Sequence, residues 1–344
     1  MNSLNPNHHL IGSLQASMRA VLDQLLPAGT PVAHVGFPDH WNAGDSAIWL
    51  GEKAMLAERG CQVLYQCSLR SYDKTVMQSL ASEATIVICG GGNLGDLWPN
   101  HQRFRERILL DFPENFVLQM PQSMCFQETK ARTEFQRICE AHRNFHLLLR
   151  DRRSLEEAQS LFNVPSTLCP DASCGLGPLR RESAPSISIM ALMRADKEAD
   201  PHAKIRPASD ITQADWIEFS ADDAALRQAA EVLGYRMANL GRELSARAHP
   251  AKKVVAEIQT LGNELAWQRL RRGLRFLSRG RVLITDRLHG HLLALALGIP
   301  HVLIDNNNHK SRALLETWTS ESALCSFAEN GDIAVTKARQ ILQA

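Results

Sequence analysis

The segment Asp286-Arg287-Leu288-His289-Gly290 combines side chains suited to chemistry on an anion. It follows an apolar run that reads as a buried strand, and it precedes the apolar residues 292–297, which read as a helix. The first turn of that helix would present its free amides, at Leu288 and His289, beside a guanidinium and an imidazole that exchanges protons near neutral pH. The pattern favours an anion-binding site with a proton-transfer group. The alternative is a capped turn with solvated side chains.

Two further cations follow strand-like runs in the second half of the chain. Arg194 comes shortly after the run 186–190, and Lys310 follows the run 300–304. The planar guanidinium of an arginine matches a carboxylate or a phosphate bidentately, and a lysine adds a compact second charge. Both side chains are candidates for the same anion site, with a solvated loop position as the alternative for each.

Polar segments follow three strand-like runs in the first half of the chain. They are Asn42-Ala43-Gly44-Asp45-Ser46, Gly90-Gly91-Gly92-Asn93-Leu94-Gly95-Asp96 and Gln119-Met120-Pro121-Gln122-Ser123. Asp45 or Ser46 can cap a helix, consecutive glycines let a ligand approach the backbone, and amides and hydroxyls hydrogen-bond sugars. Each pattern also fits an ordinary turn. The candidates for binding a second, polar substrate are Asn42, Asp45, Gly91, Gly92, Asn93, Asp96, Gln122 and Ser123.

Other charged groups offer either binding or surface roles. Arg150-Asp151 and Pro170-Asp171 end a strand or loop, where they point to the same cleft or form a surface salt-bridge cluster. Arginines also recur between residues 269 and 281, on a helix-like segment. These arginines form a solvated rim, or they contact an anionic membrane surface or a diphosphate-linked acceptor. No group of side chains has the spacing of a metal site, so we expect no bound metal.

The elements that must position these groups form an alternating series. Strand-like runs lie at residues 32–36, 61–65, 85–89, 115–119 and 146–150, with helix-like segments near 46–59, 101–110, 128–142 and 154–162. A second series has strands at 186–190, 281–285 and 300–304 and helices near 221–240 and 255–278, while residues 195–215 read as a loop. Such alternation predicts mostly parallel sheets covered by helices.

The alternation breaks between Val164 and Pro185, in a segment rich in proline, glycine and serine. At 344 residues the chain is long enough for two domains. We therefore expect an α/β protein with an N-terminal domain over residues 1–175 and a C-terminal domain over residues 185–344, whose last helix stays there or packs back on the first domain. Two Rossmann-like domains facing each other across a cleft would resemble the GT-B arrangement, with the glycine-rich loops on the acceptor side and the basic residues on the donor side.

Composition excludes several classes of protein. The chain has 44% hydrophobic and 22% charged residues and a net charge of +1, so nothing draws it to nucleic acid. Its eight cysteines form no CxxC pair, which favours reduced thiols. The start of the chain lacks the pattern of an export signal, and no run of about 18 apolar residues occurs. We expect a cytoplasmic protein that is free to touch the inner surface of the membrane.

Taken in order, these segments resemble the polysaccharide pyruvyl transferase family. The resemblance spans about residues 32 to 312 and rests on residues 42–45, 90–96, 119–123, 150–151, 170–171, 194 and 287–290, with Gly298-Ile299-Pro300. It implies a GT-B-type enzyme that attaches the enolpyruvyl group of phosphoenolpyruvate as a ketal across two sugar hydroxyls and releases phosphate. Residues 195–250 match little of the family pattern, so the resemblance defines the donor better than the acceptor.

The resemblance also implies roles for particular residues. Arg194, Arg287 and Lys310, with the amides near Leu288 and His289, would bind phosphoenolpyruvate. Arg287 and His289 would be catalytic, with His289 as the general acid. Asp45 or Asp96 would bind or deprotonate the acceptor, which is a sugar or a lipid-linked oligosaccharide of an exopolysaccharide or cell-surface glycan precursor. Phosphoenolpyruvate is a co-substrate, and no further cofactor is expected. A sugar-nucleotide-dependent glycosyltransferase and a non-catalytic polysaccharide-binding or assembly protein are the alternative hypotheses.

Overall fold

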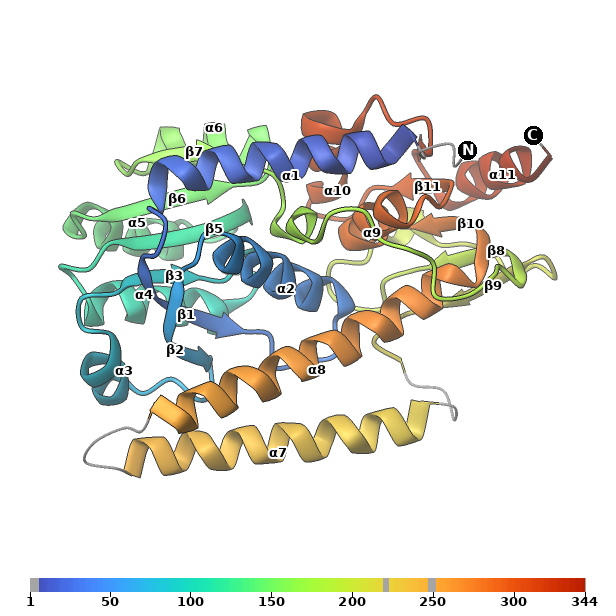
Figure 1. Ribbon diagram of the computed structural model, residues 1–344. Helices are drawn as coiled ribbons and strands as arrows, with labels where there is room; N and C mark the ends of the chain where they lie inside the picture. Colours follow the sequence, from blue (N-terminus) through green and yellow to red (C-terminus); the bar gives the residue numbers. More distant parts are fainter. Residues whose placement is uncertain (1–5, 219–222, 247–251, 344) are drawn as a thin grey trace.

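Two parallel sheets organise the chain, and each is covered by helices on both faces. The computed structural model describes residues 6–218, 223–246 and 252–343. The first sheet uses strands between residues 31 and 168, and the second uses strands between residues 187 and 328. Figure 1 shows the two sheets side by side, with α8 (Lys252–Ser278) running below both. The prediction of an α/β protein with two Rossmann-like domains in a GT-B-like arrangement is confirmed.

The strand order of the first sheet is β2-β1-β3-β5-β6-β7, with β4 paired to β5. Its strands are β1 (Pro31–Phe37), β2 (Gln62–Ser68), β3 (Thr85–Ile88), β4 (Gly91–Leu94), β5 (Val117–Met124), β6 (Phe145–Leu149) and β7 (Ser166–Leu168). The order of the second sheet is β12-β11-β10-β8-β9. Its strands are β8 (Ile187–Leu192), β9 (Ile211–Ala214), β10 (Gly280–Thr285), β11 (His301–Ile304) and β12 (Cys325–Ala328).

The other helices lie mostly between successive strands. They are α1 (Pro6–Leu25), α2 (Ala43–Glu58), α3 (Lys74–Ala81), α4 (Pro99–Asp111), α5 (Thr129–Ala141), α6 (Arg152–Leu161), α7 (Ala224–Ala246), α9 (Leu288–Leu297), α10 (Lys310–Leu314) and α11 (Gly331–Gln343), with the short turns η1 (Ala172–Leu176), η2 (Pro201–Ala203) and η4 (Leu315–Thr319).

Successive residues of the central strands enter different cores. Val87 packs in a core with α2 and α8, whereas Ile86 and Ile88 pack in a core with α3, α4 and α5. Because side chains alternate between the faces of a sheet and both faces are covered, these strands are mostly apolar on both faces, with buried polar exceptions such as His34 and Gln119. This explains why apolar runs, and not alternating patterns, predict them from the sequence.

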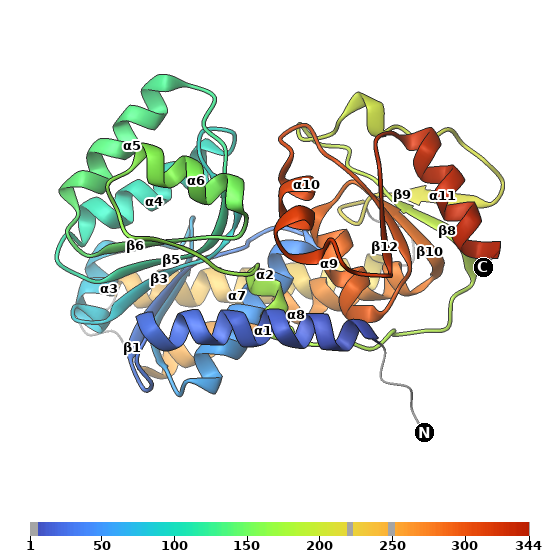
Figure 2. The ribbon, with the colours of Figure 1, turned by 90° about the horizontal axis from the view of Figure 1, so that it is seen from above.

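One apolar core is shared by the two domains. It contains Val87 of the first sheet and Leu283 of the second, with α2 and α8 between them. Helix α1 joins the domains as well: Leu22 packs in the shared core, and Leu14 packs beside Leu292 of α9. Figure 2 shows α1 lying across both lobes. The domains are therefore held together by packing and not only by the segment that links them.

Several elements differ from the sequence predictions. Strand β9 lies in the expected loop 195–215, where it is four residues long and half polar, and β4 lies inside the glycine-rich segment. The predicted helix 221–240 corresponds to α7, although residues 221 and 222 lie outside the described residues. Helix α11 packs through Ala334 and Ala338 on the second sheet, and not on the first domain as the sequence allowed. The helices that span both domains are α1 and α8.

The strand orders create a topological switch in each sheet. Strand β1 pairs with both β2 and β3, and β8 pairs with both β9 and β10, so the chain winds first to one side of each central strand and then to the other. Open parallel sheets bind ligands beyond the carboxyl ends of their strands at such points. The segments after β1 and β3 therefore face the segments after β8 and β10.

Candidate active site

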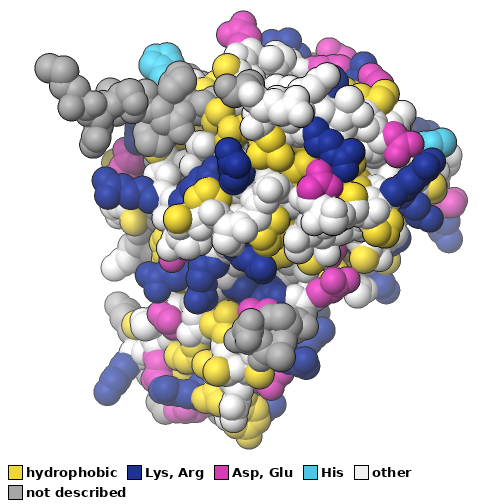
Figure 3. Space-filling model, turned by 90° about the vertical axis from the view of Figure 1, so that its right-hand side faces the viewer, with side chains coloured by type: hydrophobic (Ala, Val, Ile, Leu, Met, Phe, Trp, Pro, Cys, Tyr) yellow, Lys and Arg dark blue, Asp and Glu magenta, His cyan; other side chains and the backbone are white. Residues whose placement is uncertain are grey.

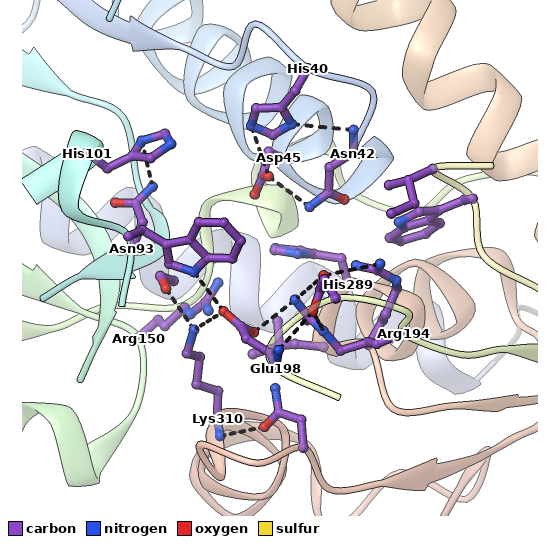
Figure 4. Close-up of a pocket in the computed structure, with 18 residues that line it drawn as sticks. His40, Asn42, Asp45, Asn93, His101, Arg150, Arg194, Glu198, His289 and Lys310 are labelled. Carbon is purple, nitrogen blue, oxygen red and sulfur yellow. Dashed lines mark hydrogen bonds and ion pairs between the residues drawn. The ribbon is translucent and has the colours of Figure 1, made fainter. Parts of the chain in front are cut away.

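A cavity of about 400 Å³ lies between the domains at these switch points. Figure 4 shows the labelled side chains converging on it, with His40, Asn42 and Asp45 across from Arg194 and His289. The predicted residues that line it are Asn42, Asp45, Gly92, Asn93, Arg194, Arg287, Leu288, His289 and Lys310. The fold thus brings the predicted donor residues and half of the predicted acceptor residues to one cavity.

Arg194 follows β8 and is held by two carboxylates. Its Nε and Nη2 donate to the two oxygens of Asp196 at 2.9 Å each, and Nη2 also lies 2.9 Å from Glu198 Oε2. Burial opposes the charged form, but Glu198 and Asp196 outweigh it and raise the pKa of Arg194. Among the described residues, none accepts a hydrogen bond from its Nη1. Arg194 is therefore a fixed cation with a donor left for a ligand.

Arg287 immediately precedes α9 and is 3% exposed. Its Nη2 donates to Asp215 Oδ2 at 2.5 Å, and its guanidinium carbon lies 5.8 Å from the centre of the Trp216 ring. Its buried Nε has no hydrogen-bond partner in the described part of the chain. A buried donor left unpaired costs about 1–3 kcal/mol. A bound anion would remove that cost, beside the free amides of the first turn of α9.

Lys310 joins the two domains. Its Nζ donates to the carbonyl of Gly92 in the first domain at 2.7 Å and lies 3.0 Å from Glu198 Oε1 in the second. The indole of Trp98 donates to the same glutamate oxygen at 2.8 Å. Burial lowers the pKa of Lys310. Burial also opposes ionisation of Glu198, but the charges of Lys310 and Arg194 lower the pKa of Glu198 to about 2. The glycine-rich segment is thereby held against the cations of the second domain.

Each cation of the cavity already has a carboxylate partner. The pairs are Arg150 with Asp171, Arg194 with Asp196, Arg287 with Asp215, and Lys310 with Glu198. The sequence offered a salt-bridge cluster as one account of Arg150 and Asp171, but for Arg194, Arg287 and Lys310 it predicted cations free to hold an anion and no carboxylate partners. Because the carboxylates fix the positions of the cations before a ligand arrives, an anion would bind to the remaining N–H groups or displace a carboxylate.

His289 points across the cleft to the first domain. Its Nε2 lies 3.3 Å from Asp171 Oδ2, and Arg150 Nη1 donates to the same oxygen at 2.6 Å. Burial alone would raise the pKa of Asp171, but the charge and hydrogen bond of His289, with Arg150 and the Ser173 hydroxyl, lower it far below its usual range. Gly44 packs against the ring, since a Cβ there would lie 2.5 Å from His289 Nδ1. The imidazole is therefore held on two sides.

The first-domain wall begins at the N-terminus of α2. The Asn42 side chain accepts a hydrogen bond from the Gly44 amide and donates from Nδ2 to Asp45 Oδ2 at 2.8 Å. Asn42 is therefore the cap of this helix, and the prediction that Asp45 or Ser46 caps it is wrong. The Asp45 carboxylate instead lies beside the cleft, 3.5 Å from His40 Nε2 (Figure 4).

The wall continues at Asn93, whose amide is part of a buried network. Its Nδ2 lies 3.3 Å from His101 Nδ1, and its Oδ1 accepts from Arg105 and from Gln122. Burial lowers the pKa of His101 to about 4, which keeps this imidazole neutral near pH 7. The wall opposite the arginines therefore presents amides, imidazoles and one carboxylate, which are groups that hydrogen-bond sugar hydroxyls.

Four predicted acceptor residues do not line the cavity. Gln122 is fully buried and accepts from the Asn93 amide at 3.0 Å, so it positions a lining residue from behind. The Ser123 hydroxyl donates to Asp151 at 2.6 Å and accepts from Arg150 at 2.8 Å. Both side chains were predicted as ligands, but their hydrogen-bonding groups are turned to the protein interior because β5 is buried along its whole length.

Asp96 and Gly91 have structural roles instead. The Asp96 carboxylate accepts hydrogen bonds from the backbone amides of Gln127, at 2.9 Å, and Glu128, at 2.6 Å, at the start of α5. Gly91 has a φ of +135°, which side chains rarely adopt, so glycine is required at the start of β4. Of the two aspartates proposed from the sequence to orient the acceptor, only Asp45 lines the cavity.

Sequence reasoning missed several lining residues, namely His40, Trp98, His101, Asp196, Glu198, Trp216 and Asn306. Asp196 and Glu198 were detectable, because they follow Arg194 by two and four residues in a charged segment after a strand. Trp98 and Trp216 carry no local signal, since a tryptophan in a loop does not reveal which domain it will face. They reach the cavity only through the docking of the two domains.

His291, His301 and Cys325 form a compact group whose ligand-type atoms lie within 4.8 Å of one another. Hydrogen bonds explain its arrangement. His301 Nδ1 must donate to the Ile299 carbonyl at 2.9 Å, so its Nε2 accepts from His291 Nδ1 at 2.7 Å, and His291 Nε2 accepts from the Thr319 hydroxyl at 2.8 Å. Burial lowers the pKa of His301 to about 4 and keeps both rings neutral. The ring nitrogens are thus all engaged.

Comparisons with known proteins agree with this geometry. The family model described as "Polysaccharide pyruvyl transferase" matches residues 42–308. The chain is 30% identical to Pyruvyl transferase 1 of Schizosaccharomyces pombe over 288 residues, covering 80% of this chain and 66% of that protein. It is 28% identical to the putative pyruvyl transferase EpsO of Bacillus subtilis over 332 residues, covering 92% of this chain and 93% of that protein.

A solved structure shares the fold. It is a functionally uncharacterised protein from Klebsiella pneumoniae, with 16% sequence identity and a TM-score of 0.58 over 92% of this chain and 98% of that one. At this identity the likeness supports the arrangement of the two domains and carries no argument about substrates.

Proposed function

This chain belongs to the polysaccharide pyruvyl transferase family, and from that premise we propose that it transfers the enolpyruvyl group of phosphoenolpyruvate to two hydroxyls of a sugar. The product would be a pyruvate ketal on an exopolysaccharide or cell-surface glycan precursor. The observation that carries the proposal is the interdomain cavity of about 400 Å³, where the cations and the N-terminus of α9 face the polar wall around Asp45.

The donor wall suits a ligand with two anionic groups. Phosphoenolpyruvate carries a carboxylate and a phosphate, and planar guanidinium groups match both. Arg287 offers a buried Nε without a partner, and Arg194 offers Nη1. The first-turn amides of α9 point to the same region. These donors support binding of one compact dianion next to Leu288 and His289.

Ketal formation requires one proton at the methylene carbon of the donor. His289 would supply it, since the ionised Asp171 stabilises the imidazolium that delivers the proton. A first sugar hydroxyl adds to carbon 2, the bond to the phosphate oxygen breaks, and a second hydroxyl closes the ketal. Of the two hydroxyl protons, one restores His289 and the other leaves with phosphate. Asp45 would orient the hydroxyls from the opposite wall.

The cellular location is part of this proposal. None of the helices among the described residues is long and apolar enough to cross a bilayer. Figure 3 shows Lys and Arg side chains interspersed with acidic ones on the face it displays. In α8, Arg269 is buried against the Pro38 carbonyl, whereas Arg271 and Arg275 are exposed, as is Arg279 just after the helix. We propose a cytoplasmic enzyme whose exposed arginines reach a lipid-linked acceptor at the inner membrane surface.

Phosphate release from phosphoenolpyruvate tests the function directly. We would offer acceptors that contain galactose, glucose or N-acetylmannosamine to the full chain and to Arg287→Ala. Acceptor-dependent phosphate release by the wild type, absent in the variant, is the expected result. Arg137→Ala is a matched control, because this arginine is exposed and lines neither this cavity nor the second one described below.

The same preparation separates the rival hypotheses. Transfer of a sugar from a nucleoside diphosphate sugar, without phosphate release from phosphoenolpyruvate, would identify a glycosyltransferase. Binding of the glycans that persists in Arg287→Ala, without turnover of either donor, would identify a binding protein.

A further inference from the structure

A second cavity, of about 600 Å³, lies in the first domain between the carboxyl end of β2 and helix α7. Gln66 and Ser68 of β2 form one side, and Gly234, Ala238 and Gly241 of α7 form the other. In Figure 1, α7 lies alongside α8 below the first sheet. This cavity is larger than the interdomain cavity, and the proposed chemistry does not use it.

Gln66 is a buried polar side chain without a partner. It is 5% exposed, and neither its Nε2 nor its Oε1 has a hydrogen bond to any described residue. Gly262 of α8 leaves room for its amide, because a Cβ there would lie 2.5 Å from Gln66 Nε2. Burying an amide without hydrogen bonds is costly, and nearly all buried polar groups are paired. Because both atoms are buried, the side chain would have to turn into the cavity for a ligand there to supply the missing donor and acceptor.

Helix α7 keeps the opposite side of the cavity open. A Cβ added at Gly234 would meet no atom within 4 Å, and one at Gly241 would meet only Ser71 Cβ, at 3.9 Å. Glycine in a helix interior is about 1 kcal/mol less favourable than alanine. Larger residues would therefore stabilise the helix, but at these positions they would fill the cavity.

The groups around the cavity indicate the chemistry of its ligand. Two carboxylates, Asp39 and Asp73, are balanced by two guanidinium groups, Arg70 and Arg242, so there is no excess of positive charge to hold a diphosphate. The remaining polar groups are the Gln66 amide and the hydroxyls of serines and of Tyr65 and Tyr72. Amides and hydroxyls that both donate and accept match the hydroxyls of a neutral saccharide.

The position of the cavity connects it to the proposed active site. Asp39 borders the second cavity, and the next residue, His40, borders the interdomain cavity. A small hollow lies between them, lined by His40 and Asp45 from the interdomain cavity and by Leu69, whose neighbours Ser68 and Arg70 line the second cavity. This hollow of about 20 Å³ has room for about one water, so a glycan whose reacting sugar lies against Asp45 would instead pass between the cavities over Asp39 and His40.

We propose that the second cavity is a subsite for further sugar units of the acceptor, so that the enzyme recognises an oligosaccharide and not a single sugar. The inference rests on the proposed function, because it takes the acceptor to be a glycan bound against Asp45. Gln66 would hydrogen-bond the more distant sugar units, and the open face of α7 would admit them.

Two substitutions test the subsite. Gln66→Leu removes the amide at similar size, and Gly241→Leu fills the cavity while raising helix propensity. The measured quantity is kcat/KM for phosphate release, with a monosaccharide and a tetrasaccharide of whichever sugar, galactose, glucose or N-acetylmannosamine, is active. For the tetrasaccharide we expect about a tenfold loss in each variant. For the monosaccharide we expect no change. Ala229→Leu, on an exposed position of α7 outside the cavity, is the control.

Equal kcat/KM values for the two acceptors in the wild type, or an unchanged tetrasaccharide value in both variants, would overturn the subsite while leaving pyruvyl transfer intact. Calorimetric binding of the same tetrasaccharide without phosphoenolpyruvate separates the two proposals further. If no acceptor gives phosphate release, binding that weakens in Gln66→Leu still supports a saccharide site. The opposite outcome is that the protein binds uridine diphosphate but not the tetrasaccharide, and that Gln66→Leu weakens this binding. That outcome would contradict a saccharide site.

Discussion

Asp171 and His289 face each other across the interdomain cleft, with Asp171 Oδ2 3.3 Å from His289 Nε2. The aspartate belongs to the segment after β7, and the histidine belongs to the first turn of α9. Because each domain contributes one member, the pair exists only when the domains are docked. Arg150 donates to the same carboxylate oxygen, so the ionised aspartate holds a cation on one side and the imidazole on the other.

Replacing Asp171 with asparagine should destabilise the fold in a pH-dependent way. The folded state lowers the pKa of Asp171 below its ordinary value of 3.8. Its stabilisation is therefore present above about pH 4 and is lost as the pH falls further. At pH 7, Asp171→Asn should lower the free energy of unfolding by about 3–5 kcal/mol, because Arg150 stays buried without a counter-charge. In urea titrations, the difference in the free energy of unfolding between the variant and the wild type should be smaller at pH 3 than at pH 7. A difference that is the same at both pH values would contradict the conclusion that ionised Asp171 stabilises the fold.

His289→Ala should abolish transfer and largely spare donor binding. Loss of a general acid typically costs 10²–10⁴-fold in rate, whereas the donors on Arg194 and Arg287 remain in place. Phosphate release would be measured beside calorimetric binding of phosphoenolpyruvate. His309→Ala is the control, since His309 is exposed and pairs with Asp305 outside the cavity. Near-normal turnover by His289→Ala would rule out the acid role.

Two glycine substitutions should separate positioning from folding. A Cβ at Gly44 would meet the side chain of His289 at 2.5 Å, whereas a Cβ at Gly51 would meet the backbone oxygen of Ala172 at 1.9 Å. Because a side chain yields more easily than backbone, Gly44→Ala should fold and lose at least about tenfold in kcat by displacing the imidazole. Gly51→Ala should mainly lower the melting temperature. Circular dichroism melts and turnover of both variants test this, and full activity in Gly44→Ala would show that the ring position is not critical.

Glu198→Gln should remove stability at neutral pH by loosening the contact between Lys310 and Gly92. The pKa of Glu198 falls from 4.5 to about 2 in the fold, so its stabilisation is complete above pH 4.5 and is lost between about pH 4.5 and 2. The free energy of unfolding of the variant should therefore lie below that of the wild type at pH 7 and approach it at pH 2.5. Glu316→Gln, in an exposed pair with Arg312, should stay within about 0.5 kcal/mol of wild type. If both substitutions changed the free energy of unfolding equally, Glu198 would not have the proposed role in holding the two domains together.

Glu52→Gln should show the opposite pH trend. Glu52 is fully buried, accepts from the Gly90 amide at 2.8 Å and lies 2.8 Å from His34 Nε2. Burial raises the pKa of Glu52 from 4.5 to about 8. The protonated carboxyl of Glu52 therefore contributes fully to the stability of the fold below pH 4.5. This contribution is lost as the pH rises from 4.5 to about 8. Glutamine does not titrate. The free energy of unfolding of the variant, measured in urea, should therefore rise relative to that of the wild type between pH 5 and pH 8. A pH-independent difference would mean that Glu52 does not carry the proton.

Much of the fold follows from the sequence. The apolar runs that become β1, β3, β5, β8 and β10 are visible because strands buried on both faces need mostly apolar side chains on each face. The residues at their carboxyl ends, among them Asn42, Arg194 and Arg287, were therefore identifiable as candidates. Strands β4 and β9 were not, because they are short and polar and form only through pairing with β5 and β8.

The sequence by itself determined which residue types stand after which strands, and hence an anion-binding donor wall and a polar acceptor wall. Only the tertiary structure decided which of them meet. The burial of β5 inside the first domain turns Gln122 and Ser123 inward. The docking of the domains through α1 and α8 pairs His289 with Asp171 and Lys310 with Gly92. Such contacts join segments more than 100 residues apart, and no local pattern records them, because charge partners and helix caps are selected by distance in space and not by spacing along the chain.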